Sequence, residues 1–208
     1  GWTRIALDRD GRTVRFTRPG MALDLGGIGK GYALDRAAAT LGALGVRHAT
    51  LDLGGQLLVM GVGAATRVAV AHPGSRLEPA VELEVGDASV STSGQSERGF
   101  DAGGVRYGHI LDPRTGRPVP GAATVTVVCR SATRADALST ALLVMGRVRA
   151  EAFARAHAIG ALWLEPAGRT VRAWSWNLPG ARTAPGAHVQ WMDDGTLSKL
   201  MLKPGEKR

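Results

Sequence analysis

The sequence predicts an α+β domain of mixed and antiparallel sheets with a few packed helices, covering residues 1–176 and followed by a looser extension over residues 177–208. Strand and helix patterns interleave without a regular βαβ repeat, which favours α+β over α/β. The 208 residues are 44% hydrophobic and 21% charged, so disordered, collagen-like and membrane-spanning classes fit poorly. A chain of this length can bury a sizeable core without disulfides.

The N-terminal part predicts a hairpin and then a strand, a glycine turn and a helix. The alternating segments TRIALD and RTVRF flank an Asp10-Gly11 turn, which is a hairpin signal. A short strand is expected at residues 21–25, before the glycines of residues 26–31. Apolar residues recur at helical spacing over residues 32–44, and Gly45 is the expected end of that helix.

Short strands separated by Gly, Pro and Asp clusters fill the middle of the chain. They are expected at residues 49–53, 57–60, 67–71, 80–85 and 88–91. The Gly-rich stretch STSGQSERGFDAGG that follows predicts a loop. The segment HILDPRTGRPV, residues 109–119, has too much Pro, Gly and Asp for regular structure beyond its first residues.

The remaining part predicts two helices among short strands. A β-branched strand at residues 123–129 leads to Ser131, a typical N-cap, and to an apolar helical face that ends at Gly146. Beyond this helix we expect a third helix and three strands, at residues 149–157, 161–165, 170–174 and 188–192.

The charge distribution argues against nucleic-acid binding. The chain carries 26 Lys and Arg against 18 Asp and Glu, a formal net charge of +8. The arginines are scattered rather than gathered in a run or along one helix. Two interpretations remain, an Arg-rich solvated surface or a positive field that attracts anionic ligands such as phosphates. Only four of the basic residues are lysines: Lys30, Lys199, Lys203 and Lys207.

Cysteine content and hydropathy exclude an internal disulfide and a membrane-spanning helix. The one cysteine, Cys129, cannot form an internal disulfide, and its apolar run TVTVVC favours a buried structural thiol over a nucleophile. No segment approaches the roughly 18 apolar residues of a spanning helix, and the first residues have no apolar signal-peptide core. We therefore expect the chain as given to be soluble. Removal of a leader peptide from a longer precursor stays open.

The glycine turn at residues 26–31 favours anion binding without matching a named motif. A P-loop ending at Lys30 would need Gly at position 24 and Ser or Thr at position 31, where the chain has Asp24 and Gly31, and the GxGxxG fingerprint also fails to match. A strand that feeds a glycine turn and a helix still exposes backbone N–H groups that bind phosphate. Lys30 would add a compact positive charge. The alternative is a tight turn with a solvated lysine.

The predicted helix after Ser131 supplies a pair of oxygen ligands. Asp136 and Thr140 are four residues apart, so their side chains share one helix face. A carboxylate and a hydroxyl suit Mg²⁺, which needs only one or two protein ligands when phosphates and water complete its shell. The alternative is an ordinary solvated pair. Ser139 is expected to point elsewhere.

Two polar segments provide further candidates. His109 lies in a Gly/Pro-framed loop with Asp112 and two arginines, which suits a general base beside a phosphate clamp; a structural histidine is the alternative. The segment Thr92-Ser93-Gly94 does not match the G-x-S-x-G motif of serine hydrolases. Its hydroxyls and amides fit the wall of a ligand pocket better.

Five segments in order resemble the FAD:protein FMN transferases, the ApbE-type flavin transferases. The resemblance rests on DLGGIGKGYALD (24–35), LDLGG (51–55), STSG (91–94), HILDPRTGRPV (109–119) and ADALSTALLVMG (135–146). Any one motif is modest, but five in this order are specific, and the resemblance covers roughly residues 1–175. The fold that the resemblance implies is the α+β flavin transferase domain.

The resemblance implies a function and residue roles. The family uses Mg²⁺ and FAD to attach FMN through a phosphoester to a Ser or Thr hydroxyl of a target protein, releasing AMP. Asp136, Thr140 and the Gly27 carbonyl would be metal ligands, Lys30 would lie by the diphosphate, and His109 would be the catalytic base. The flavin-nucleotide pocket would also involve Thr92, Ser93, Gly94, Ile110, Asp112, Thr115 and Gly116.

The resemblance also implies partners and a location. Targets in the family are often membrane-bound redox subunits with a short Ser/Thr motif, and members generally work outside the bacterial cytoplasm. Family members are usually longer at the N-terminus, so we interpret this chain as a fragment, a cleavage product or a shortened homologue. Two alternatives to transfer stay open: a non-catalytic flavin or nucleotide binder, and a pyrophosphatase that hydrolyses FAD to FMN and AMP.

Overall fold

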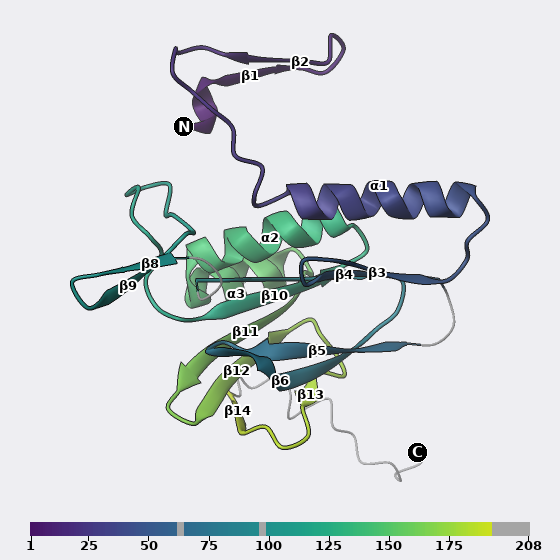
Figure 1. Ribbon diagram of the computed structural model, residues 1–208, viewed down its shortest axis with the longest axis vertical. Helices are drawn as coiled ribbons and strands as arrows, with labels where there is room; N and C mark the ends of the chain where they lie inside the picture. The colour runs from purple at the N-terminus through teal and green to yellow at the C-terminus, as the bar shows by residue number, and fades with distance from the viewer. Residues whose placement is uncertain (62–64, 96–98, 193–208) are drawn as a thin grey trace.

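A computed structural model describes residues 1–61, 65–95 and 99–192 of the chain, and it confirms the α+β class. Three of the four lysines and the end of the predicted extension lie outside these residues. Three helices are described, α1 (Gly29–Ala43), α2 (Ala132–Met145) and α3 (Arg147–Ala156). They lie together over one face of the main sheet (Figure 1).

The main sheet has seven strands in the order β14-β12-β11-β10-β7-β4-β3. All neighbours are antiparallel except β12 and β14, which are parallel. The central strands therefore bring together segments that are distant in sequence. The bounds are β3 Ala49–Leu53, β4 Gln56–Met60, β7 Ser89–Gly94, β10 Thr124–Cys129, β11 Gly160–Ala167, β12 Thr170–Trp176 and β14 Val189–Trp191.

A second sheet covers the face of the main sheet that the helices leave open. Its order is β13-β6-β5, with bounds β5 Thr66–His72, β6 Ser75–Val85 and β13 Arg182–Thr183. The core accordingly has two parts, one between the helices and the main sheet and one between the two sheets. The domain is thus built from three layers.

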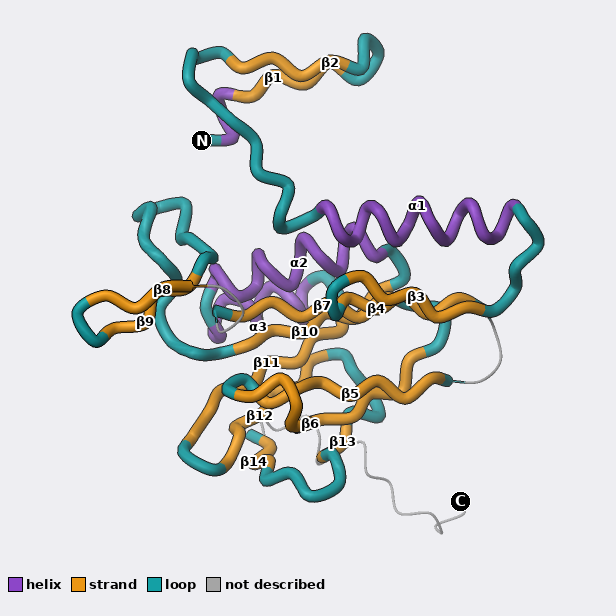
Figure 2. Tube along the Cα trace, viewed as in Figure 1, coloured by secondary structure: helices purple, strands orange, loops and turns teal. Residues whose placement is uncertain are grey.

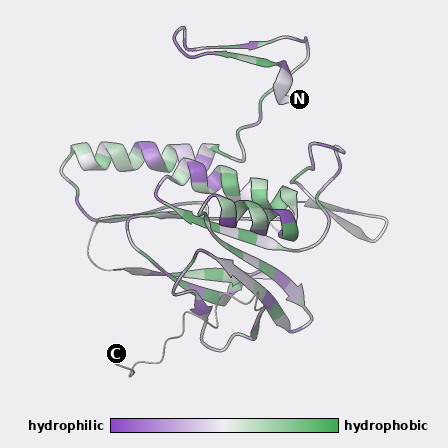
Figure 3. Cartoon of the chain, turned by 180° about the vertical axis from the view of Figure 1, so that it is seen from behind, coloured by the Kyte–Doolittle hydropathy of each residue, from purple (hydrophilic) through white to green (hydrophobic). Residues whose placement is uncertain are grey.

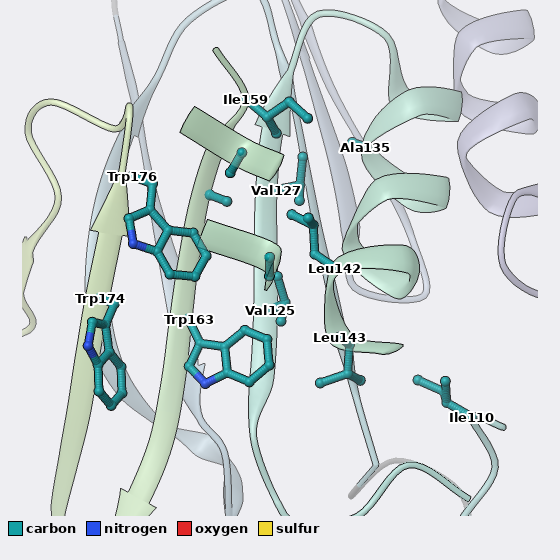
Figure 4. Packing of buried hydrophobic residues seen from close by; sticks show 13 residues of the cluster. Ile110, Val125, Val127, Ala135, Leu142, Leu143, Ile159, Trp163, Trp174 and Trp176 are labelled. Carbon is teal, nitrogen blue, oxygen red and sulfur yellow. The ribbon is translucent and has the colours of Figure 1, made fainter. Parts of the chain in front are cut away.

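The helix side of the core is rich in tryptophan. Trp163 on β11 and Trp176 on β12 lie with ring centroids 6.5 Å apart, and Leu142 of α2 faces Val125 and Val127 of β10 (Figure 4). Beyond its first turn α2 is coloured mainly hydrophobic, whereas α1 mixes hydrophilic and hydrophobic residues (Figure 3). This difference matches their positions, since α2 packs against the central strands, whereas α1 lies over α2 and the edge strands β3 and β4, where Leu34 packs against Leu58.

The predicted N-terminal hairpin is present and stands away from the layers. It comprises the 3-10 turn η1 (Trp2–Arg4) and the strands β1 (Ile5–Asp8) and β2 (Thr13–Phe16). Figure 2 shows a loop as its connection to α1. Trp2 and Leu7 expose 82% and 70% of their surface.

Several expected boundaries are wrong, for tertiary reasons. Residues 21–25 form no strand because no strand in the described part of the chain pairs with them. Leu25 instead accepts hydrogen bonds from the N–H groups of Ile28 and Gly29. The expected loop after residue 91 begins as strand, since Ser93 pairs with Val125 of β10. That stretch then forms a hairpin of β8 (Gly99–Ala102) and β9 (Val105–Gly108), with Phe100 stacked on Tyr107.

The described part of the C-terminal segment, residues 177–192, contains two short strands, where the sequence suggested a looser extension. The expected strand near residue 190 is present as β14, which pairs with β12, while β13 pairs with β6. Arg182 also forms ion pairs with Glu82 and Glu84 of β6. The proposed division of the chain at residue 176 stays a prediction.

Candidate functional site

The predicted glycine turn lies where α1 crosses α2. Gly31, in the first turn of α1, is buried against the start of α2, and a Cβ at this position would overlap the backbone carbonyl of Ala132. Only glycine allows the two helix backbones to approach this closely. The residue therefore sets the separation of the two helices that carry the candidate site.

Each of these helices caps the other with a carboxylate. Asp136 of α2 is 3% exposed, and its Oδ2 accepts a hydrogen bond of 3.0 Å from the N–H of Gly31. Asp35 of α1 accepts hydrogen bonds from the N–H groups of Ala132 (2.8 Å) and Thr133 (3.0 Å), and from the hydroxyl groups of Ser131 and Thr133. A carboxylate at a helix N-terminus is favoured by the dipole and by the unpaired N–H groups.

Removing the Asp35 cap should lower stability in a pH-dependent way. Partial burial raises the pKa of Asp35, but the hydrogen bonds from Thr133, Ala132 and Ser131 outweigh it and leave the pKa below its usual value. The carboxylate thus stabilises the fold at neutral pH, and this contribution is lost as the pH falls below about 4. We expect Asp35→Ala to lower the free energy of unfolding by about 1–3 kcal/mol at pH 7.

Urea unfolding followed by circular dichroism at pH 7 and pH 3 measures this effect. The difference between wild type and Asp35→Ala should shrink at pH 3, because below its usual pKa this carboxylate takes up a proton more readily in the unfolded chain than in the folded one. A difference that stays constant between the two pH values would show that the carboxylate charge plays no part.

A group of hydroxyls joins strand β7 to α2. Ser93 Oγ lies 2.9 Å from Thr140 Oγ1 and 2.8 Å from Ser139 Oγ, and Ser91 Oγ lies 3.3 Å from the same Ser139 atom. Ser139 in turn donates to the backbone carbonyl of Asp136. We expected Ser139 to point elsewhere than Asp136 and Thr140, but its hydroxyl shares the partner Ser93 with Thr140 and connects β7 to the turn of α2 that carries Asp136.

The other side of β7 faces a cavity. Because side chains alternate along a strand, Thr92 and Gly94 point away from Ser93. Both residues line a cavity of about 320 Å³, and Thr92 Oγ1 lies 2.8 Å from Thr126 Oγ1. The cavity is bordered by Gly54 and Gly55 of the β3–β4 turn and by residues of β5. The STSG segment thus contributes to two different surfaces.

The residues predicted as metal ligands are brought together. A Cβ on Gly27 would lie 3.7 Å from Thr140 Oγ1, so the glycine turn runs directly past this hydroxyl. Among the described residues, Asp136 Oδ2 accepts the bond from Gly31 and the other carboxylate oxygen accepts none. The same residues contain no cluster of three or more His, Cys, Asp or Glu side chains. One carboxylate among neutral oxygens suits Mg²⁺ with phosphate ligands better than a metal held by protein alone.

Lys30 connects the glycine turn to a second motif. Its Cδ lies 3.9 Å from the position of a Cβ on Gly54, which has a positive φ of 60° in the turn of LDLGG. Within the described parts of the chain, its ammonium group makes no hydrogen bond or ion pair. The charge is therefore available to an anion beside the N-terminus of α1.

The segment HILDPRTGRPV, residues 109–119, contains no helix or strand, as predicted, and its own hydrogen bonds close it into a loop. Leu111 and Pro118 form a β-bridge, and the N–H groups of Thr115 and Gly116 both donate to the carbonyl of Asp112. A side-chain hydrogen bond from Arg114, together with its backbone N–H and its charge, lowers the pKa of Asp112 to about 2. The Asp112 carboxylate therefore braces this turn.

His109 and Ile110 lie at the start of the same loop and face different surroundings. Ile110 is buried in the core beneath the helices, whereas His109 is exposed. The structure thus gathers the predicted site residues into two groups: Gly27, Ser93, Asp136 and Thr140 around the glycine turn, and His109 to Gly116 in the loop.

Two buried or capping residues were missed by the sequence analysis. Gln95, immediately after β7, bonds to the backbone at both ends of the His109 loop, and Asp35 caps α2. Asp35 lies within the quoted motif DLGGIGKGYALD, but its partners are 96–98 residues away. The partners of Gln95 are 15 and 24 residues away, so no local pattern marks either residue.

No helix in the described part of the chain is both long enough and apolar enough to cross a bilayer.

Comparisons with known proteins agree on one family. The model of the ApbE family matches residues 1–163. A protein of Rhodobacter capsulatus named FAD:protein FMN transferase is 45% identical over 139 residues, 65% of this chain and 26% of that protein. A protein of the same name from Vibrio cholerae is 36% identical over 163 residues, 76% of this chain and 49% of that protein. The chain therefore spans half or less of these relatives.

Solved structures show the same relationship. The flavin transferase ApbE from Vibrio cholerae superposes with a TM-score of 0.73 at 30% identity, covering 85% of this chain and 57% of that one. The ApbE protein from Thermotoga maritima gives a TM-score of 0.72 at 33% identity, covering 78% and 54%. The layers described above are thus shared with these proteins.

Proposed function

The chain belongs to the ApbE family, and on that premise we propose that it catalyses the Mg²⁺-dependent transfer of FMN from FAD to a Ser or Thr hydroxyl of a target protein, releasing AMP. The observation that carries the proposal is the convergence of Asp136, Thr140 and the Gly27 backbone beside Lys30, at the N-terminus of α1. Hard oxygen ligands, a free ammonium group and a helix N-terminus together suit a diphosphate.

Asp136, Thr140 and the Gly27 carbonyl would hold the Mg²⁺. The bound ion would neutralise charge on the diphosphate as the bond to AMP breaks. The protein prepares these ligands through its own contacts: Gly31 holds one oxygen of Asp136, and Ser93 holds the hydroxyl of Thr140. Lys30 would bind the same diphosphate and stabilise the negative charge on the leaving AMP.

His109 would act on the acceptor. A neutral hydroxyl attacks phosphorus poorly, so its proton has to be removed as the new bond forms. In the proposed step, the imidazole of His109 takes this proton and the acceptor oxygen bonds to the FMN phosphorus. The bond from that phosphorus to the AMP oxygen breaks at the same time. Exposure of His109 lets a protein acceptor reach it.

Replacing His109 with alanine should reduce transfer much more than FAD binding. Loss of a general base typically lowers the rate by about 10²–10⁴-fold. The turn that would contact the nucleotide is closed by its own bonds to Asp112, so we expect the Kd for FAD to change by less than about threefold. Equal losses of rate and affinity, measured by AMP release and FAD titration, would make His109 a binding residue.

One incubation tests the proposed function. The 208-residue chain is mixed with FAD and Mg²⁺, with and without a peptide that carries a candidate acceptor threonine, and AMP and peptide mass are followed. A peptide that gains FMN as AMP appears supports transfer. AMP without labelled peptide supports the alternative pyrophosphatase, in which water replaces the hydroxyl. Bound FAD without AMP supports a non-catalytic binder.

We further propose that the acceptor is a membrane-bound redox subunit with a short Ser/Thr motif and that the chain works outside the cytoplasm of a bacterium. Support for both comes from the family membership alone. Labelling of a membrane fraction with FAD, followed by detection of covalent flavin on a Ser or Thr residue, would test the first.

A further inference from the structure

We propose that Gln95 is a positioning residue for the proposed flavin transfer, because its side-chain amide closes the loop that carries His109. The inference rests on the proposed function and adds to it a residue outside the predicted site. Gln95 follows strand β7 directly and is 6% exposed. A buried amide of this kind is costly unless all of its hydrogen-bonding groups have partners.

All hydrogen-bonding groups of this amide are used on the loop. Nε2 of Gln95 donates to the carbonyl of Ile110 at 2.8 Å and to the carbonyl of Val119 at 2.9 Å. Oε1 accepts from the N–H of Ile110 at 3.0 Å. Val119 also donates to the Ile110 carbonyl at 2.9 Å, so the side chain completes a small backbone network. Both ends of the loop are thereby tied to one residue.

His109 lies between two residues that contact Gln95. On one side, Ile110 is bonded through both its N–H and its carbonyl. On the other side, a Cβ on Gly108 would overlap the Gln95 amide, so the backbone of Gly108 lies directly against it. The backbone of His109 is therefore held from both neighbours, although His109 itself is exposed.

Gln95 also connects the two groups of site residues. Ser93, two positions earlier, contacts Thr140, so one short segment of chain orients a candidate metal ligand and the loop of the candidate base. The turn around Asp112 and Gly116 closes through its own hydrogen bonds and does not depend on Gln95. Loss of Gln95 should therefore displace His109 without opening the turn.

Gln95→Leu tests this role by removing every hydrogen bond at similar volume. We expect kcat for AMP release to fall by about 10- to 100-fold, since a misplacement of about 1 Å can have that effect, while the Kd for FAD stays within about threefold. Backbone hydrogen exchange at Ile110 and Val119 should become faster. Gln190→Leu, at the exposed middle position of strand β14, is the matched control and should leave each quantity unchanged.

Gln95→Glu provides a second measurement, the pH dependence of kcat, which should not change if Gln95 is a purely structural residue. In this variant the buried carboxylate would face the carbonyl oxygens of Ile110 and Val119, which raises its pKa. Only at lower pH would the side chain carry a proton that it can donate to one of these carbonyls. The ratio of variant to wild-type kcat should therefore rise several-fold between pH 8 and pH 5.5. The leucine variant should show no such rise.

The outcomes are distinguishable. Wild-type kcat in Gln95→Leu, or a flat ratio in Gln95→Glu, would overturn the positioning role even if the wild type is an active transferase. A wild-type chain without turnover would overturn the proposed function, and the catalytic role of Gln95 with it. Hydrogen exchange at Ile110 would then still report whether the amide closes the loop.

Discussion

Replacing Asp136 with asparagine should abolish Mg²⁺-dependent release of AMP, with a loss of at least about 100-fold at a limiting Mg²⁺ concentration. Asp136 is the one carboxylate among the proposed ligands, and without it the ion would be held by neutral oxygens and phosphates. Asparagine is the informative change because its side-chain oxygen can still accept the hydrogen bond from Gly31. The helix contact is kept while the charge is removed.

The measurement is the rate of AMP release over a titration of Mg²⁺. Asp87→Asn is a matched control, because Asp87 also accepts a hydrogen bond from a glycine N–H, that of Gly61, and lies outside the proposed site. If the Asp136 variant keeps full activity at limiting Mg²⁺, the metal assignment is wrong. A parallel urea unfolding curve separates lost activity from lost stability.

Replacing Gly31 with alanine should lower the free energy of unfolding by about 2–3 kcal/mol. The added Cβ would overlap backbone atoms of Ala132 and Thr133. Backbone atoms within a helix cannot relieve such a clash by a change of rotamer. Overpacking of this kind typically costs 1–3 kcal/mol, and separation of the helices would also lengthen the bond between Gly31 and Asp136. AMP release should fall as well.

Gly42→Ala is the control within the same helix. Nothing lies within 4 Å of a Cβ at this position, so the change should stabilise the protein by about 0.5–1 kcal/mol through helix propensity. Opposite signs for the two substitutions in urea unfolding would confirm that the contact with α2 requires Gly31. Two stabilising substitutions would show that the helices have room to separate.

Most elements could be predicted because their signals are local. The hairpin around Asp10-Gly11 and the cap at Ser131, whose side chain accepts from Arg134, depend on residues within a few positions of one another. The expectations that were wrong concern pairing with distant segments. Among the residues that the structure describes, no strand pairs with residues 21–25. Strand β7, by contrast, extends to Gly94 because Thr124 of β10, thirty residues later, pairs with it.

The residue types of the candidate site and the family can both be identified from the order of amino acids alone. Asp136 and Thr140 lie one helical turn apart in any α-helix. The glycines of residues 26–31 predict a turn that leads into a helix, although α1 already begins at Gly29. The contacts of these residues could not be predicted in the same way, because they depend on how distant segments pack. Gly31 meets Ala132 across 101 positions, and Asp35 caps a helix 97 positions away. Such contacts are set by how the layers pack. A hydrogen bond or a close approach of two backbones requires short distances in space, whatever the separation along the chain.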